Sequence, residues 1–264
     1  MLVTQPLMAA AVAFLPMTPV GTLPGTDPEY RFSRAMRAGQ TLAIANIDGA
    51  VTVTRAAGGT AEVVVTKRVI RGDGDLVRAI LEESGDQITV CTIYLREASD
   101  RRDRCNADTN HDGWRRREPL EVEMTYEVRL PAGVELSVAA VDGDVTVTGL
   151  AAPARITTVD GSVRVTGRAP DRITTVDGDI ELEAEGGLPA EMRLNTVDGS
   201  VLLRLPEGSG FDVHASTLDG ALESDFPLTV QGRWGPRSLR GRVGDGRTAI
   251  RVTTVDGDVM IRRR

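Results

Sequence analysis

Residues 159–165, Val-Asp-Gly-Ser-Val-Arg-Val, carry a pattern that recurs through the second half of the chain. Close copies begin at Val141, Val176, Val197 and Val255, and a weaker copy begins at Leu218. An outlying copy occupies residues 46–53. The units are about 17 to 21 residues long, with a longer step before the last copy, and a repeat of this length indicates a stacked repeat architecture.

Apolar residues alternate within each unit, at Val159, Val163 and Val165 on the same parity as Gly161, and this period of two is typical of a half-buried strand. A corner or bulge is expected just upstream, because Ile156 breaks the alternation. A unit this short cannot bury an apolar face alone, so it gains a core only by stacking on its neighbours.

The repeat therefore predicts an all-β fold, a right-handed parallel β-solenoid resembling a β-helix, of about seven coils and about 30 to 35 Å in length. Residues 239–246 are expected to form a divergent coil that fills the longer step before Val255. A β-sandwich or β-roll is the alternative, since it also contains many short strands.

The pattern is less regular before the repeats. Strands are predicted at 61–70, 86–95 and 120–130, with a short helical piece at 76–83. We expect an irregular β region over 28–135 that covers one end of a repeat domain at 136–264, because an open solenoid end exposes unpaired backbone groups.

The N-terminal residues 2–15 are uncharged and mostly apolar. The run is shorter than the about 18 to 20 residues that span a bilayer, so it favours a signal peptide over 1–27, with no transmembrane anchor after cleavage. A buried terminal strand or helix is the alternative, since no Arg or Lys precedes the run. We expect an extracytoplasmic protein, in the periplasm, at the cell surface or secreted, with its only two cysteines, Cys91 and Cys105, joined in a disulfide.

The composition argues against nucleic acid as a partner. The formal net charge is −7, and aromatic residues make up only 3% of the chain. A negative protein repels phosphate backbones, and few aromatic rings leave few platforms on which bases could stack.

Stacked turns are expected to align six aspartates in an outward row, flanked by threonines. Such a row of like charges is unfavourable unless something neutralises it. The carboxylates could accept hydrogen bonds from turn amides, or the row could bind cations or a hydroxyl-rich polymer. The aspartates are Asp142, Asp160, Asp177, Asp198, Asp219 and Asp256, and the threonines are Thr158, Thr175, Thr196, Thr217 and Thr254.

A second candidate is the loop that contains Asp108, Asn110 and Asp112, followed by Gly113. Oxygen ligands at alternate positions before a glycine resemble the first half of a calcium-binding loop. Pro119 stands where the twelfth position should be a bidentate acid, so a solvated loop braced by the disulfide is the alternative. No other metal or cofactor is expected.

The recurrent Thr-Val-Asp-Gly units, the early Asn-Ile-Asp-Gly-Ala-Val-Thr-Val copy and the Leu-Pro-Ala-Gly-Val turn at 130–134 resemble the bacterial "putative adhesin" family of β-solenoid domains, whose function is unknown. The resemblance covers residues 38–264. It implies an extracytoplasmic or envelope-associated protein and supplies no catalytic residues. The insertion between Cys91 and Glu118 departs from the pattern.

The functional hypothesis is an exported, non-catalytic, adhesin-like binding or scaffold protein whose partner is an unidentified envelope polymer or protein. One alternative is a carbohydrate-active β-helix enzyme, which would need a non-repeated acid pair in a groove beside Trp114 or Trp234. Another is a structural or sensory envelope module whose terminal faces dock other chains. The acids recur at every turn, which favours architecture over a catalytic pair.

Overall fold

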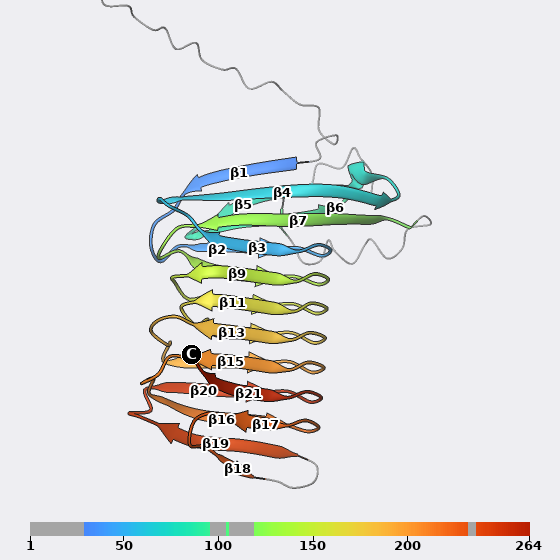
Figure 1. Ribbon diagram of the computed structural model, residues 1–264. Coiled ribbons are helices and arrows are strands. Elements are labelled where there is room, and N and C mark those ends of the chain that lie inside the picture. Colours follow the sequence, from blue (N-terminus) through green and yellow to red (C-terminus); the bar gives the residue numbers. More distant parts are fainter. Residues whose placement is uncertain (1–28, 96–103, 106–118, 232–235) are drawn as a thin grey trace, which may run out of the picture.

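The computed structural model describes residues 29–95, 104–105, 119–231 and 236–264, and it confirms the all-β solenoid (Figure 1). Within these ranges the strands form two large sheets, sheet A with ten strands and sheet B with eleven, and the one helical element is a 3-10 turn, η1, at Gly74–Leu76. Within the same ranges, no helix has the length and apolarity needed to cross a membrane.

Each coil contributes one strand to sheet B and the next strand to sheet A, and coil strands run parallel to their neighbours. In spatial order the seven coils are β2 (Thr41–Ala45) with β3 (Val51–Arg55), β8 (Glu135–Ala139) with β9 (Val145–Leu150), β10 (Ala154–Thr157) with β11 (Val163–Gly167), β12 (Arg172–Thr174) with β13 (Ile180–Ala184), β14 (Glu191–Asn195) with β15 (Val201–Leu205), β20 (Thr248–Thr253) with β21 (Val259–Arg263), and β16 (Phe211–Thr217) with β17 (Leu222–Ser224).

The last coil along the chain is not the last coil in space. Strand β20 lies between β14 and β16, and β21 lies between β15 and β17, so residues 248–263 are inserted into the stack (Figure 1). The C-terminal residue, Arg264, consequently lies beside Leu205 rather than at an end of the column, and its backbone N–H donates to the Leu205 carbonyl at 2.9 Å.

The prediction of a divergent coil at 239–246 is wrong. Strand β19 (Arg237–Val243) runs antiparallel to β16, and β18 (Thr229–Gln231) runs antiparallel to β19, so this segment closes one end of sheet B. Within β19 only Leu239 is buried. One inward side chain cannot supply the core-facing row that a coil needs, whereas it suffices for a strand that covers the end of the stack.

The opposite end carries the irregular β region that the sequence predicted. Strands β7 (Glu121–Leu130) and β6 (Gln87–Tyr94) continue the parallel ladders, and β4 (Thr60–Arg71) and β5 (Val77–Ser84) then pair antiparallel to them. Strand β1 (Glu29–Ala35) lies outermost on sheet A. The predicted helical piece at 76–83 is wrong, because β5 pairs with β6 along its whole length and this tertiary pairing overrides the local pattern.

One apolar core runs the length of the column, from Leu42 and Ile44 in the first coil to Phe211 in the last. The first coil lies within the predicted N-terminal region and stacks directly on β8 and β9 of the repeat region. The division of the chain near residue 135 stays a prediction.

Candidate functional site

The Asp-Gly turns form one edge of the solenoid, here called the turn edge, which lies on the right in Figure 1. Isolated backbone bridges join successive aspartates from coil to coil. Close packing of these turns demands glycine: at Gly257, where φ is +147°, an added Cβ would lie 2.1 Å from the Gly199 carbonyl oxygen. In spatial order the joined aspartates are Asp48, Asp142, Asp160, Asp177, Asp198, Asp256 and Asp219.

The valine that opens each turn faces solvent, contrary to the predicted alternation. Val159 is 39% exposed, whereas Val163 and Val165 are buried. Val159 and Asp160 both lie outside because the corner falls at this pair and not upstream of it. The turn edge therefore carries an exposed apolar row beside the aspartates: Val141, Val159, Val176, Val197, Val255 and Leu218.

The threonine row lies inside, which corrects the expectation that it flanks the aspartates outside. Thr158, Thr175, Thr196, Thr217 and Thr254 are all buried. The Thr196 hydroxyl donates to the carbonyl oxygens of Gly178 at 3.0 Å and Val176 at 3.4 Å on the preceding coil, and Thr175 makes the equivalent bonds. Thr158 is the exception, since its buried hydroxyl has no hydrogen-bond partner among the described residues. The threonines join coil to coil and do not form a binding surface.

The row aspartates do not cap the turn amides. In the described ranges, no hydrogen bond or ion pair engages the exposed side chains of Asp160 or its counterparts. The second acid of the turn accepts these hydrogen bonds instead. The Asp144 carboxylate accepts from the Ser162 N–H at 2.8 Å, and the Asp179 carboxylate accepts from the Ser200 N–H at 2.8 Å. The binding role proposed for the aspartate row stays a prediction.

Asp48 begins the row and is half-buried. Burial raises the pKa of its carboxyl, and the negative charges of Asp142, Glu123 and Glu121 raise this pKa further. The Arg68 guanidinium opposes this shift. The described residues nevertheless contain no group of three or more acids, histidines or cysteines arranged to hold a metal ion.

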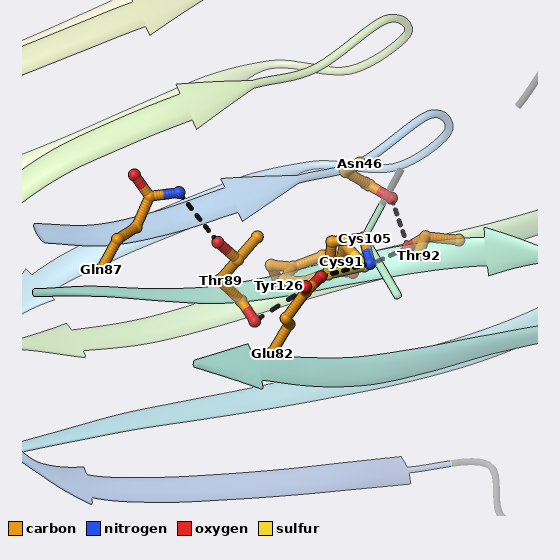
Figure 2. Close-up of a disulfide and its surroundings, with 8 residues drawn as sticks. All are labelled: Asn46, Glu82, Gln87, Thr89, Cys91, Thr92, Cys105 and Tyr126. Atoms are coloured by element: carbon orange, nitrogen blue, oxygen red, sulfur yellow. Dashed lines mark hydrogen bonds between the residues drawn. A yellow bond between two sulfur atoms is a disulfide. The ribbon is translucent and has the colours of Figure 1, made fainter. Parts of the chain in front are cut away.

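The predicted disulfide between Cys91 and Cys105 is present, with 5.8 Å between the two Cα atoms (Figure 2). Cys91 is buried on β6, and the Cys105 N–H donates to the Glu82 carboxylate at 2.7 Å. On the same strand, the buried Thr92 hydroxyl donates to the Asn46 side-chain oxygen at 2.9 Å and lies 2.7 Å from the Tyr126 hydroxyl. Burial raises the pKa of Tyr126.

Several predicted features lie outside the described residues. They are the signal peptide at 1–27, the candidate calcium ligands Asp108, Asn110 and Asp112, and the aromatic residues Trp114 and Trp234. These expectations therefore stay predictions.

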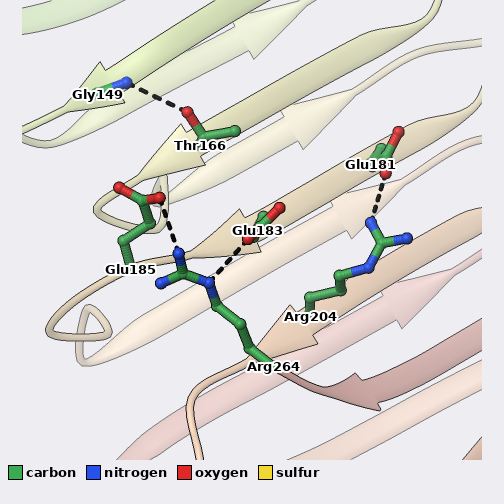
Figure 3. Close-up of polar contacts among 7 residues, drawn as sticks. All are labelled: Gly149, Thr166, Glu181, Glu183, Glu185, Arg204 and Arg264. Atoms are coloured by element: carbon green, nitrogen blue, oxygen red, sulfur yellow. Dashed lines mark hydrogen bonds and ion pairs between the residues drawn. The ribbon is translucent and has the colours of Figure 1, made fainter.

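The outer face of sheet A has its charges paired between neighbouring coils (Figure 3). Glu181 contacts both Arg164 and Arg204, which lie on the strands either side of it. Arg264 bridges to Glu183 at 2.7 Å and to Glu185 at 3.0 Å. Arg164, Arg204, Arg262 and Arg264 thus each have an acid partner on another coil.

On the outer face of sheet B, basic residues are aligned across neighbouring strands, and the sequence did not lead us to expect this alignment. The strand register places six residues opposite one another, which we call the arginine row: Arg155, Arg172, Arg193, Arg251, His214 and Arg240. Each of the first five stands five positions before an aspartate of the turn edge, a constant offset that was readable in the repeat. Burial and the charges of Arg240 and Arg251 lower the pKa of His214.

A groove of about 400 Å³ lies against one end of the arginine row. Four arginines line it, Arg155, Arg168, Arg172 and Arg193, together with the acids Asp171 and Glu191. The described part of the chain thus offers two contrasting surfaces, an acidic and apolar turn edge and a basic face on sheet B.

The sequence of this chain is similar to that of one known protein family. Residues 36–262 match the sequence profile of the Toastrack family, DUF4097. The chain belongs to this family. Membership in the Toastrack family confirms the resemblance noted in the sequence and accords with the stacked coils. No curated protein matches the chain.

Solved structures similar to this Toastrack chain are distant in sequence. A "putative cell adhesion protein" from Clostridium sporogenes is 11% identical, with a TM-score of 0.48 over 89% of this chain and 100% of that chain. A "putative adhesin" from Bacteroides fragilis is 10% identical, with a TM-score of 0.39 over 92% of this chain and 100% of that chain.

Proposed function

We propose that this Toastrack protein is an extracytoplasmic, non-catalytic binding or scaffold protein of the adhesin-like kind. The observation that carries the proposal is the exposed repetition: the same side-chain chemistry recurs on successive coils at a spacing of about 4.8 Å. Such a surface offers many equivalent contacts to an extended partner, in place of one unique pocket.

The repetition also supports a non-catalytic role. Hydrolysis of a glycosidic bond needs two acids in distinct environments on either side of the bond. The exposed aspartates of the turn edge recur once per coil with the same backbone pairing, so no two of them are set apart in that way.

The disulfide supports a location outside the cytosol, because structural disulfides persist in oxidising compartments. The uncharged N-terminal run supports export independently. Fractionation of the host cells would distinguish among the periplasm, the cell surface and the medium.

The test is to incubate the purified chain with isolated bacterial envelopes and with a panel of charged and uncharged polysaccharides, and to assay the same mixtures for new reducing ends. Cosedimentation or retarded migration without new reducing ends is the expected result. New reducing ends would overturn the proposal in favour of the enzyme. Absence of binding to every envelope fraction and polymer would overturn it in favour of a structural module that docks other chains through its terminal faces.

A further inference from the structure

The arginine row spans six adjacent strands of sheet B, and His214, whose pKa is lowered, lies between Arg251 and Arg240. Arg172 on β12 stands opposite Arg155 on β10 and Arg193 on β14, and the row continues through Arg251 on β20. Adjacent strands lie about 4.8 Å apart, so the six positions span about 24 Å along the column. Like charges directly opposite one another destabilise a sheet.

Little within the chain compensates this charge. Glu191 pairs with Arg193 at 2.7 Å and approaches Arg251 at 3.9 Å. In the ranges that the structure describes, Arg155, Arg172 and Arg240 form no ion pair. The row therefore keeps most of its positive charge exposed to solvent.

The arginine row is not a by-product of a basic composition, because the whole chain carries a formal net charge of −7. On sheet A the same repeat also brings acids and bases into contact, as Glu181 does with Arg164 and Arg204. The two faces have the same backbone spacing. Sheet A does place Arg204 opposite Arg262, but each of these two has an acid partner. Among the described strands, sheet B instead repeats bases of which several have no acid partner.

A second row of side chains, here called the polar row, runs parallel to the arginine row. Its members lie two positions after the row residue on the parallel strands, and two positions before Arg240 on the antiparallel β19. It consists of hydroxyl and amide groups that are exposed or half-buried: Thr157, Thr174, Asn195, Thr253, Ser216 and Ser238. Phe211, the one aromatic residue of β10, β12, β14, β20 and β16, is buried. As far as the structure describes it, the face thus offers cations and hydrogen-bonding groups and no exposed aromatic ring on these five strands.

We propose that the arginine row binds a linear anionic polysaccharide lying along the solenoid axis. Guanidinium groups contact the sulfate, phosphate or carboxylate groups of the polymer, since Arg matches such oxyanions with paired hydrogen bonds. The polar row contacts the sugar hydroxyls, and the groove lined by Arg155 and Arg172 holds one anionic substituent at the end of the row. This inference rests on the proposed function and names its ligand class.

Binding of this kind releases counterions, so the affinity falls as salt rises, with a slope set by the number of charges neutralised. The probes are dextran sulfate, polygalacturonate, uncharged dextran of the same length, and single-stranded DNA. The affinity of the full chain is measured by fluorescence anisotropy of labelled polymer across a salt series that includes about 150 mM. Dextran sulfate and polygalacturonate are expected to bind, and uncharged dextran is not.

The decisive variant combines Arg155→Gln, Arg172→Gln and Arg193→Gln. Its matched control combines Arg164→Gln, Arg204→Gln and Arg262→Gln on sheet A, which removes the same number of charges from the opposite face. The sheet B variant is expected to lose about tenfold or more in affinity and to flatten the salt slope by about 2 to 3. The control is expected to bind within about twofold of the unmodified chain.

Equal losses in the two variants would show a general charge effect and overturn the inference, as would tighter binding of DNA than of both anionic polysaccharides. If cell envelopes bind but neither anionic polysaccharide does, the ligand class is wrong and the proposed function stands. If nothing binds, both fail. Circular dichroism and thermal unfolding of each variant separate loss of binding from loss of fold.

Discussion

Arg172 stands directly opposite Arg193 in the parallel pairing of β12 with β14, and in the part of the chain that the structure describes only Arg193 of the two has an acid partner, Glu191. The pair is therefore a site of repulsion built into a regular ladder. Repeated from strand to strand, such a contact destabilises the sheet unless an external charge offsets it.

Arg172→Gln should stabilise the free protein, by about 0.2 to 1 kcal/mol, because it removes repulsion from both neighbouring strands. Urea unfolding at low and high salt measures the effect, and the gain should shrink as salt screens the charges. Arg164→Gln on sheet A is the control and should destabilise the fold slightly, since Arg164 pairs with Glu181 on one neighbouring strand and stands opposite Thr146 on the other. A loss of stability in Arg172→Gln would contradict the assignment of repulsion.

The threonines inside the turn edge offer a matched pair of substitutions. Thr196→Val removes a buried hydroxyl that donates to Gly178, and should cost about 1 kcal/mol of unfolding free energy. Thr158→Val removes a buried hydroxyl that has no hydrogen-bond partner in the described part of the chain, and should be neutral or stabilising. Chemical denaturation of both variants tests the contrast, and equal costs would show that the hydrogen bonds contribute nothing.

The repeat at 159–165 was enough to predict the solenoid, because alternation and period are local properties of the sequence. The order of the coils was not predictable in the same way. Every unit presents a similar apolar face, so nothing local specifies that residues 248–263 stack between the coils at 191–205 and 211–224. That order depends on where β18 and β19 turn back along sheet B.

The sequence predicted the aspartate row of the turn edge, but it did not predict the exposed valines or the arginine row. The aspartates were found because Asp-Gly is a recognisable turn signal. The exposure of Val159 was missed, since a corner places two successive side chains outside and shifts the parity of the strand. Arg155 and Arg172 were missed although their offset from the turn is constant, because a single strand position becomes a row only when the coils are stacked in register.

Gly257→Ala should destabilise the fold by more than about 2 kcal/mol, because a left-handed backbone is strained with a side chain and the new Cβ would meet the Gly199 carbonyl. Gly186→Ala is the control, since no atom of the described residues lies within 4 Å of its added Cβ, and it should change stability by less than about 0.5 kcal/mol. Thermal unfolding compares the two, and similar midpoints would contradict close stacking at the turn edge.

Replacement of both Cys91 and Cys105 by Ala should cost about 3 kcal/mol, because the disulfide restricts the unfolded chain around the loop that it closes. Urea unfolding with and without reductant measures this cost. Reductant should lower the stability of the unmodified protein and leave the double variant unchanged. Equal sensitivity to reductant in the two proteins, or none in either, would contradict a stabilising disulfide.

Asp48→Asn should stabilise the protein at neutral pH and have no effect in acid. The folded-state pKa of Asp48 is raised above 3.8 by burial and by Asp142, Glu123 and Glu121, so the folded state binds this proton more tightly than the unfolded state. The free energy of unfolding therefore falls as pH rises from 3.8 through the raised pKa, and the penalty is fully present above it. The gain in Asp48→Asn should be less than about 1 kcal/mol, because the carboxyl is only half-buried.

Urea unfolding of Asp48→Asn across a pH series gives the profile, and the gain should vanish below pH 3.8, where both states are protonated. Asp160→Asn, the same change on an exposed turn two coils further along, is the control and should give a smaller gain at neutral pH. A gain in Asp48→Asn that persists unchanged in acid would assign the effect to packing instead of charge. A gain that follows the titration would show that the first carboxylate of the row is held at a cost to folding.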